Sequence, residues 1–357
     1  MARVTLKMIA EKAGTSVGTV DRALNNRKGV KEDRRKLVLQ VAEELGFQPN
    51  RLASALARKR NVHIGIIYPR RPSEFYRDMD MGIDKAAFEL QDYGVTIERI
   101  RCETQDPAIV RAQLAQIDPE HFDGLVINSA GAANIDQVDH FVNNGLPVAT
   151  FNTDTVESKR LFYIGDNSRQ SGMMGGEILG MLLGGRGNVL VFGNFTRTTP
   201  FIERFGGFCE FVYPSFPGIH MLPCLECFND PELAEKDLIH VLSNTPDISG
   251  VFCTGYSSTV GAINALKAMN RRDIRLVGYD LTQYTADALR GGWCDALLYQ
   301  DPYRQGHQAA HLLAKHILEG WMPSKTHLHI DTRIIIKSNL DSYISGSDQL
   351  LESNLER

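Results

Sequence analysis

A chain of 357 residues is too long for one small domain and suits a head joined to two larger lobes. Its hydrophobic content of 43% and charged content of 23% are ordinary for a soluble globular protein, and no stretch approaches the ~20 apolar residues of a membrane span. Residues 1–60 carry 14 Lys and Arg against 6 Asp and Glu, while the remaining residues carry 25 against 37, so a basic head precedes an acidic body.

The amino-terminal sequence and the cysteines indicate the cellular compartment of the protein. The first helical pattern begins within six residues of Met1, which leaves no room for a signal peptide before it. Six cysteines are scattered through the chain without the spacing of a disulfide framework, as suits a reducing compartment. These features predict a cytoplasmic protein with no membrane partner.

Residues 5–45 have the pattern of three short helices. The first, over 5–13, places apolar side chains on one face: Leu6, Ile9, Ala10 and Ala13. Ser16 follows a break at Gly14 and is placed to cap the second helix, over 17–24. A third helix, over 32–45, closes the core with Leu37, Val38, Val41, Ala42 and Leu45. Two helices joined by a tight turn predict a helix-turn-helix, whose second helix enters the major groove of DNA.

From residue 62 onward, buried strands alternate with longer helices. Strands are predicted over 62–68, 95–100, 124–128, 147–151, 188–192, 219–222, 251–253, 274–278 and 296–299. Helices are predicted over 74–93, 107–117, 135–144, 168–183, 201–211, 231–242, 258–269, 284–290 and 303–318. Such alternation indicates parallel sheets built from βαβ units, and its restart after residue 165 predicts two similar doubly wound lobes. The last segments are expected to cross back between the lobes.

The runs VTLKMIAEKAGTSVGTVDRALNN and GVKEDRRKLVLQVAEELGFQPNRLASAL resemble the head and hinge of the lac-repressor (LacI) family. Residues 62–339 resemble the ribose-binding-like branch of the type 1 periplasmic-binding-protein fold. The expected fold is therefore an all-α helix-turn-helix head followed by an α/β body of two doubly wound lobes. The expected parts are a head over 1–49, a hinge helix over 50–60, a body over 61–339 and a polar tail over 340–357. The N-lobe is expected over 61–162 and 292–323, and the C-lobe over 163–291 and 324–339.

The LacI resemblance implies which residues contact DNA. The residues expected to position the DNA backbone are Thr5, Leu6, Ser16, Thr19, Asn25, Val30 and Asn50. Val17, Gly18 and Arg22 are expected to face bases. Leu56 corresponds to a leucine that wedges between base pairs in the minor groove, and Ala53 belongs to the same hinge run. Asp21 replaces the family's usual serine and Gly18 lacks a side chain, so the operator sequence stays open.

A cleft between the lobes is expected to hold a sugar-like ligand. A sugar has apolar faces and a rim of hydroxyls, so its site needs aromatic rings and planar polar groups. Phe75 and Tyr76 follow the first strand and can supply rings, although either can instead be a core residue. Resemblance to sugar-binding relatives implies polar contacts from Asn152, Asp154, Arg204, Asp280 and Gln300. Taken alone, however, Arg204 is more typical of a surface ion-pair partner, and Asp280 is equally a helix cap.

Other motifs predict no chemistry. His307 and His311 have metal-ligand spacing on a helix but lack the glutamate of HExxH, and Cys224 and Cys227 form a single CxxC. No phosphate-binding loop and no nucleophile with a partner base is present. We expect no catalytic residue, no metal and no cofactor.

The sequence predicts a homodimeric transcription regulator, acting as a repressor, on a pseudo-palindromic double-stranded DNA operator. A dimer is expected because one recognition helix reads only a few base pairs. A monosaccharide or polyol in the cleft is expected to control operator affinity. The alternatives are activation instead of repression, a purine-type corepressor, a sugar-binding protein without regulatory role, and a sugar-processing enzyme fused to a DNA-binding head.

Overall fold

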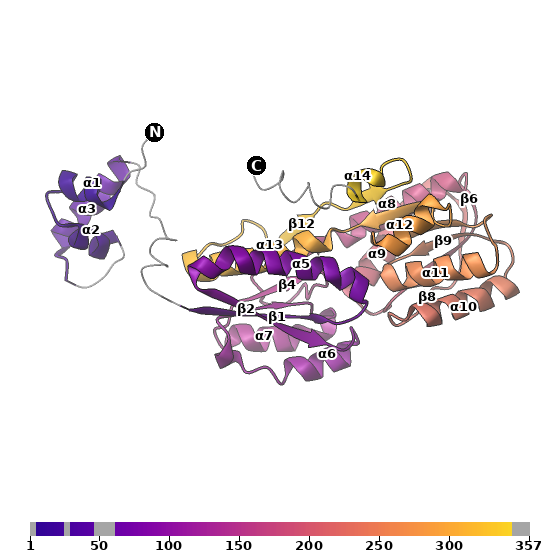
Figure 1. The fold of residues 1–357 in the computed structure, drawn as a ribbon, viewed down its shortest axis with the longest axis horizontal. Helices are drawn as coiled ribbons and strands as arrows, with labels where there is room; N and C mark the ends of the chain where they lie inside the picture. Colours follow the sequence, from indigo (N-terminus) through magenta and orange to yellow (C-terminus); the bar gives the residue numbers. More distant parts are fainter. Residues whose placement is uncertain (1–4, 25–28, 46–60, 345–357) are drawn as a thin grey trace. The chain divides into compact units, whose positions relative to one another are not determined.

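The computed structural model describes residues 5–24, 29–45 and 61–344 (Figure 1). It divides into two compact units, residues 1–58 and residues 59–357, which are taken separately below. The expected hinge helix over 50–60 lies outside the described residues. No helix within the described ranges is long and apolar enough to span a membrane.

The head contains three helices, α1 (Leu6–Lys12), α2 (Val17–Leu24) and α3 (Glu32–Glu44). The Thr5 hydroxyl caps α1, and the Ser16 hydroxyl accepts a hydrogen bond from the Thr19 amide at 3.2 Å, which confirms the predicted cap of α2. The three helices enclose a small core of Ile9, Ala10, Ala13, Val20, Ala23, Val38, Val41 and Ala42. Leu37, expected in this core, is 41% exposed because it lies about 100° around α3 from Val38.

The N-lobe is a six-stranded parallel sheet in the order β12-β5-β4-β3-β1-β2. Its strands are β1 (Val62–Pro69), β2 (Val95–Cys102), β3 (Gly124–Ile127), β4 (Val148–Phe151), β5 (Phe162–Asp166) and β12 (His327–Ile330). One apolar core lies between the sheet and the helices α5 (Ser73–Leu90) and α13 (Pro302–Glu319). A second core lies under α6 (Pro107–Leu114) and α7 (Ile135–Asn143), on the other face (Figure 1).

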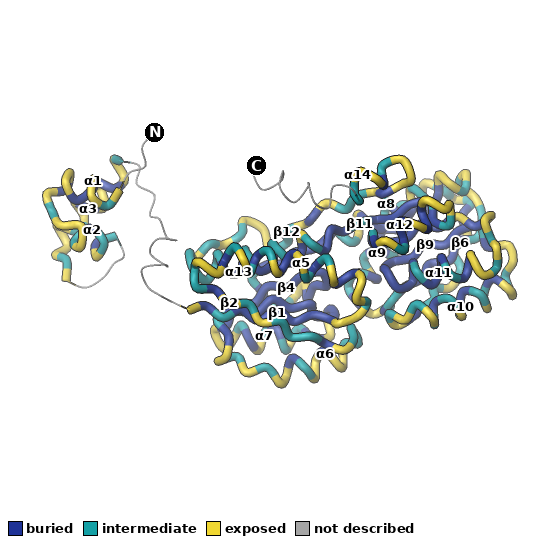
Figure 2. Tube along the Cα trace, in the orientation of Figure 1, coloured by how far each residue is buried: buried dark blue, intermediate teal, exposed yellow. Residues whose placement is uncertain are grey.

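The C-lobe sheet has the order β13-β11-β10-β9-β6-β7, with β8 also beside β6. Its strands are β6 (Arg186–Gly193), β7 (Gly218–Met221), β8 (Leu225–Glu226), β9 (Ile248–Cys253), β10 (Arg275–Tyr279), β11 (Ala296–Tyr299) and the antiparallel β13 (Arg333–Ile335). One face packs against α8 (Ser168–Leu182) and α9 (Thr199–Ser215), and the other against α10 (Pro231–Asn244), α11 (Tyr256–Ala268) and α12 (Gln283–Arg290). In both lobes the central strands are buried, whereas the outer faces of the helices are exposed (Figure 2).

Three segments cross between the lobes, and they place the lobe boundaries differently from the sequence prediction. β5 and β12 pair with each other in the N-lobe sheet, whereas β11 and β13 pair in the C-lobe sheet. The N-lobe therefore comprises 61–166 and 302–330, and the C-lobe 168–299 and 333–344, so the expected boundaries near 162, 292 and 323 were wrong. The boundary at 339 was also wrong, because Leu340 is buried in the C-lobe core beside α14 (Asp341–Ile344).

Candidate functional site

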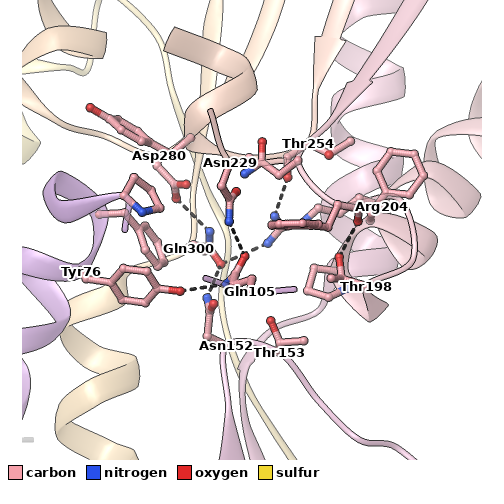
Figure 3. Close-up of a pocket in the computed structure, with 18 residues that line it drawn as sticks. Tyr76, Gln105, Asn152, Thr153, Thr198, Arg204, Asn229, Thr254, Asp280 and Gln300 are labelled. Carbon is pink, nitrogen blue, oxygen red and sulfur yellow. Dashed lines mark hydrogen bonds between the residues drawn. The ribbon is translucent and has the colours of Figure 1, made fainter. Parts of the chain in front are cut away.

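A pocket lies between the two lobes, where the parallel strands of both sheets end. Its N-lobe walls come from the loops after β1, β2 and β4: Pro72, Phe75, Tyr76, Gln105, Asn152 and Thr153. Its C-lobe walls come from the loops and helix starts after β6, β8, β9, β10 and β11: Asn194, Phe195, Thr198, Pro200, Phe201, Arg204, Asn229, Thr254, Gly255, Tyr256, Asp280 and Gln300. Six of the seven predicted ligand contacts therefore line one pocket (Figure 3).

Arg204, in the second turn of α9, is a buried cation held by several partners. One terminal nitrogen donates to the Thr254 carbonyl at 2.7 Å, and the other donates to Asp166 at 3.0 Å and to the Gln300 side chain at 3.1 Å. The guanidinium also lies 4.1 Å over the ring of Tyr279. Its Nε–H is buried and, among the described residues, has no hydrogen-bond partner. Arg204 is thus a fixed pocket cation with one donor unused, and the surface ion-pair interpretation is wrong.

Asp280 follows β10 and is 3% exposed, with a left-handed backbone φ of 70°. Gln300 donates to its carboxylate at 2.9 Å. Burial raises the pKa of Asp280 to about 7, against the lowering effects of Gln300 and Arg204. The alternative that Asp280 caps the next helix is wrong, because the hydroxyl of Thr282 accepts from the Thr285 amide as the cap of α12. Asp280 is therefore a desolvated carboxyl at the pocket wall.

Side-chain amides connect the charged groups to the N-lobe. Asn152 donates to Gln300 at 3.3 Å, and Asn128, behind it, donates to Asn152 at 3.1 Å. On the other side of the pocket, Gln105 donates to the Tyr76 hydroxyl at 2.8 Å and accepts from Asn229 at 2.9 Å (Figure 3). The Asn229 side-chain oxygen is buried without a partner in the part of the chain that the structure describes.

Asp154 is the predicted contact that does not line the pocket. Its carboxylate accepts from Thr150 at 2.6 Å and forms an ion pair with the buried Arg160. Asn152 has a φ of 60°, and the Thr153 amide bonds back to the Phe151 carbonyl at 2.6 Å. This tight turn breaks the strand alternation that would have put residues 152 and 154 on one side, so Asp154 supports the loop from behind.

The sequence prediction missed several pocket residues: Gln105, Thr153, Asn194, Thr198, Asn229, Thr254 and Tyr256. Every one follows a strand within a few residues, and that position was the available signal. Packing explains why a glycine stands at position 255. A Cβ atom added there would lie 2.6 Å from the side-chain amide nitrogen of Asn194. Asn194 itself accepts from the Ser258 amide at 3.1 Å and fixes the start of α11. The pocket therefore has no room for a larger residue at position 255.

The second helix of the head exposes the three residues that are predicted to face bases. Val17, Gly18 and Arg22 are exposed on α2, and the Arg22 Nε–H donates to the Gly18 carbonyl at 3.0 Å. The residues of this face are therefore accessible to a major groove, as a recognition helix requires.

Comparison with known families agrees with both units. Residues 5–50 match the family described as bacterial regulatory proteins, lacI family, and residues 64–320 match the periplasmic binding protein domain. The chain belongs to the periplasmic binding protein domain family through its body, and its head carries a lacI-family helix-turn-helix domain. This regulator is 24% identical over 285 residues to the "Probable HTH-type transcriptional repressor ExuR" of Bacillus subtilis, covering 78% of this chain and 81% of the relative. It is 24% identical over 289 residues to the ribose operon repressor of Halalkalibacterium halodurans, covering 77% and 80%.

Solved structures also show the fold of the body. An ABC transporter solute binding protein from Burkholderia graminis, in complex with D-arabinose, matches with a TM-score of 0.73 and 20% identity. The match covers 80% of this chain and 98% of that protein. It confirms the two-lobed periplasmic-binding-protein fold.

The other residues predicted to contact DNA have different structural positions in the lacI-family head. Thr5 and Ser16 act as helix caps, and the Thr19 hydroxyl lies 2.9 Å from that of Ser16. Leu6 and Val30 are partly buried and pack against the head core. Four predicted contacts lie outside the described residues: Asn25, Asn50, Ala53 and Leu56. Contact with DNA stays a prediction for the whole set.

Proposed function

We propose that this lacI-family regulator is a repressor whose operator affinity is controlled by a monosaccharide or polyol in the interlobe pocket. The observation that carries the proposal is the convergence of Arg204, Asp280 and Asn229 on one pocket that also contains aromatic rings. Hydroxyl groups can donate to the carboxylate of Asp280 and the free oxygen of Asn229, and can accept from the unused Nε–H of Arg204. Phe75 and Tyr256 can cover an apolar sugar face.

Backbone strain supports a binding role for the same residues. Asn152, Asn229 and Asp280 all have positive φ values, of 60°, 61° and 70°. Non-glycine residues in this conformation each cost on the order of 1–3 kcal/mol and tend to occur at ligand-binding sites. Three such residues lie around this one pocket, which supports a binding role for their side chains.

Control of DNA binding follows from the pocket's place between the lobes. A ligand that contacts both lobes favours one lobe arrangement over another, and only such a difference in affinity can shift an equilibrium. A homodimer in the cytoplasm, with one recognition helix for each operator half-site, would convert the lobe arrangement into operator affinity. The lacI-family head at residues 5–50 argues against a sugar-binding protein without a regulatory role. The transcription-repressor relatives argue against an enzyme.

The test begins with a thermal-shift screen of the full-length protein against monosaccharides, polyols, sugar phosphates and purines. The best ligand is then titrated calorimetrically into wild type, Arg204→Lys and the control Arg169→Lys. Arg169 is an exposed arginine that pairs with Glu210 at 2.6 Å on the protein surface. Loss of a charge-assisted hydrogen bond costs about 1.5–3 kcal/mol, so Arg204→Lys should weaken binding roughly ten- to a hundredfold.

Operator binding with and without the ligand completes the test. The proposal expects the ligand to change the operator affinity of wild type and of Arg169→Lys, and much less that of Arg204→Lys at the same concentration. A purine as the strongest ligand would contradict the sugar assignment. Unchanged ligand affinity in Arg204→Lys would show that the effector binds elsewhere.

A further inference from the structure

Three side chains suited to metal binding meet where the N-lobe strands begin. His63 is the second residue of β1, Glu98 lies in β2, and His121 ends a short 3-10 helix, Pro119–His121, before β3. One ligand atom from each lies within 4.8 Å of the other two. The effector pocket lies beyond the opposite end of β1, at Pro72, and the strand from His63 to Pro69 alone spans about 20 Å. The cluster is therefore separate from the pocket.

The distances from Glu98 to the two histidines suit a tetrahedral ion. The Glu98 Oε2 atom lies 3.2 Å from the His63 Nε2 atom and 3.3 Å from the His121 Nε2 atom. Zinc bonds to nitrogen and oxygen are about 2.0–2.1 Å, so two ligands of a tetrahedral zinc ion lie about 3.3 Å apart. Both distances already have the value that a shared ion would impose.

Hydrogen bonding directs the His63 ring toward that position. Its Nδ1 atom lies 3.1 Å from the backbone carbonyl of His121, which can only accept, so Nδ1 carries the proton. Nε2 is then the ring nitrogen that faces the Glu98 carboxylate, at 3.2 Å, and it can bind an ion that the carboxylate shares. A ring N–H bound to a backbone carbonyl is also the usual support of a metal-ligating histidine.

Packing holds the two imidazoles in place. Their ring centroids are 4.7 Å apart, and Phe122 packs against both rings at 4.9 and 4.8 Å. The His63 amide donates to the Asp123 carboxylate at 2.9 Å, which ties the start of β1 to the turn before β3. Two of the three ligands thus stand on sheet strands, and the third is fixed by the turn.

A second cluster on the same lobe provides a contrast. Glu89, His307 and His311 also come together, between α5 and α13. There the His307 Nε2 atom lies 2.7 Å from Glu89, a normal hydrogen-bond distance, while the His311 Nδ1 atom is 4.0 Å away. Lys85 also pairs with Glu89 at 3.4 Å, and its positive charge opposes a metal ion. In the described part of the chain, the ion pairs of Glu98 involve only its two histidines.

We propose that His63, Glu98 and His121 form a binding site for a divalent transition-metal ion of the zinc class. Two imidazoles and one carboxylate are a common zinc ligand set, and water takes the fourth position. The partly exposed side chains of Glu98 and His121 leave that position open to solvent. His63 lies three residues after the predicted hinge, so a bound ion would stabilise the first strand of the body at the end nearest the hinge in the chain.

The experiment uses the full-length protein, freed of metal with a chelator that is then removed. Calorimetric titration with zinc chloride should show one ion per chain in wild type. Glu98→Gln and His121→Ala should each bind zinc at least about tenfold more weakly, since loss of even a supporting group costs about 10–100-fold. The control variant His307→Ala/His311→Ala should bind like wild type. Melting curves without metal verify that each variant is folded.

Cobalt gives an independent readout, because tetrahedral Co²⁺ should develop visible absorption bands in wild type and in the control, and not in Glu98→Gln. Three results would overturn the proposal. They are zinc affinity weaker than about 100 μM, equal affinity in wild type and His121→Ala, or loss of binding in the His307/His311 control. His121 lies on a turn and its side chain is 58% exposed, so its replacement keeps the test valid if Glu98→Gln fails to fold.

Discussion

Replacing Asp280 with Asn should stabilise the ligand-free protein at neutral and alkaline pH. The pKa of this carboxyl is raised by burial from 3.8 to about 7, so the folded state holds its proton more tightly than the unfolded state does. Stability then falls as the pH rises from about 4 to about 7, and the full loss is present above pH 7. One pKa unit corresponds to about 1.4 kcal/mol, which puts that loss on the order of 4 kcal/mol.

Asparagine at position 280 carries no charge and retains an oxygen that can accept from Gln300, as Asp280 does at 2.9 Å. The variant should therefore match wild type near pH 4 and exceed it by up to about 4 kcal/mol at pH 8. For a body of this size, that difference raises the melting temperature by on the order of 5 °C. The same variant should bind the effector roughly ten- to a hundredfold more weakly, because it loses the charged acceptor.

The assay is urea unfolding of both proteins at pH 4.5 and pH 8, and the measured quantity is the difference in free energy of unfolding. Other titrating groups are common to both proteins and cancel in that difference. Asp273→Asn is the matched control, since Asp273 is exposed on the surface beside Arg271, and its replacement should change stability by less than about 0.5 kcal/mol at pH 8. A difference between Asp280→Asn and wild type that is equal at both pH values would refute the reasoning.

Three further predictions concern the effector and DNA. Effector affinity should be about tenfold weaker at pH 6 than at pH 8, because the Asp280 carboxyl, with a pKa of about 7, is only about one-tenth ionised at pH 6. Calorimetry at both pH values checks this. Equal affinities would show that the ligand does not need the carboxylate. Leu56→Ala should weaken operator binding and reduce DNA bending, because it removes the predicted wedge, and it should leave effector affinity unchanged. An unchanged bend angle in gel mobility assays would contradict the minor-groove prediction. Operator affinity should fall steeply with salt, by about 10³–10⁵ between 50 and 200 mM if a dimer neutralises six to ten phosphates; a flat response in a binding titration would show that the basic head does not face DNA.

The sequence predicted the long elements well because their patterns arise from local burial. β1 is a run of buried residues bounded by Pro69, and its predicted range differs from the observed one by a single residue. β12 and β13 were not predicted, because each has mostly partly buried or exposed residues and contributes only one buried position. Their sheet membership depends on pairing with β5 and β11, far away in the chain, and local patterns do not contain such information.

In the candidate site, too, some residues could be predicted from the sequence and others could not. Arg204, Asp280 and Gln300 were predictable, since the ends of parallel strands meet at one edge of a sheet. Asp154 was misplaced because the turn at Asn152 reverses the direction of the chain there, and this depends on a single backbone angle. Gln105 and Asn229 were missed although they bond to each other across the pocket, because a contact between two loops on different lobes leaves no periodic signal.

The contacts between the lobes show how an effector could act on this body. Neutral hydrogen bonds already join the two lobes, since Asn229 donates to Gln105 at 2.9 Å and Thr199 donates to the Asp154 carbonyl at 3.0 Å. The buried ion pair between Arg204 and Asp166, at 3.0 Å, joins them as well. Each neutral bond contributes only about 1 kcal/mol, and a hydrogen bond to a charged group about 1.5–3 kcal/mol. To shift a two-state equilibrium from 1:99 to 99:1, a ligand must favour one state by about 5.5 kcal/mol. Two or three charge-assisted hydrogen bonds supply that amount, and the pocket offers them through Arg204 and Asp280. The charged groups therefore allow a ligand to switch the lobe arrangement. A ligand that bound only the neutral amides would gain too little binding free energy to shift the equilibrium.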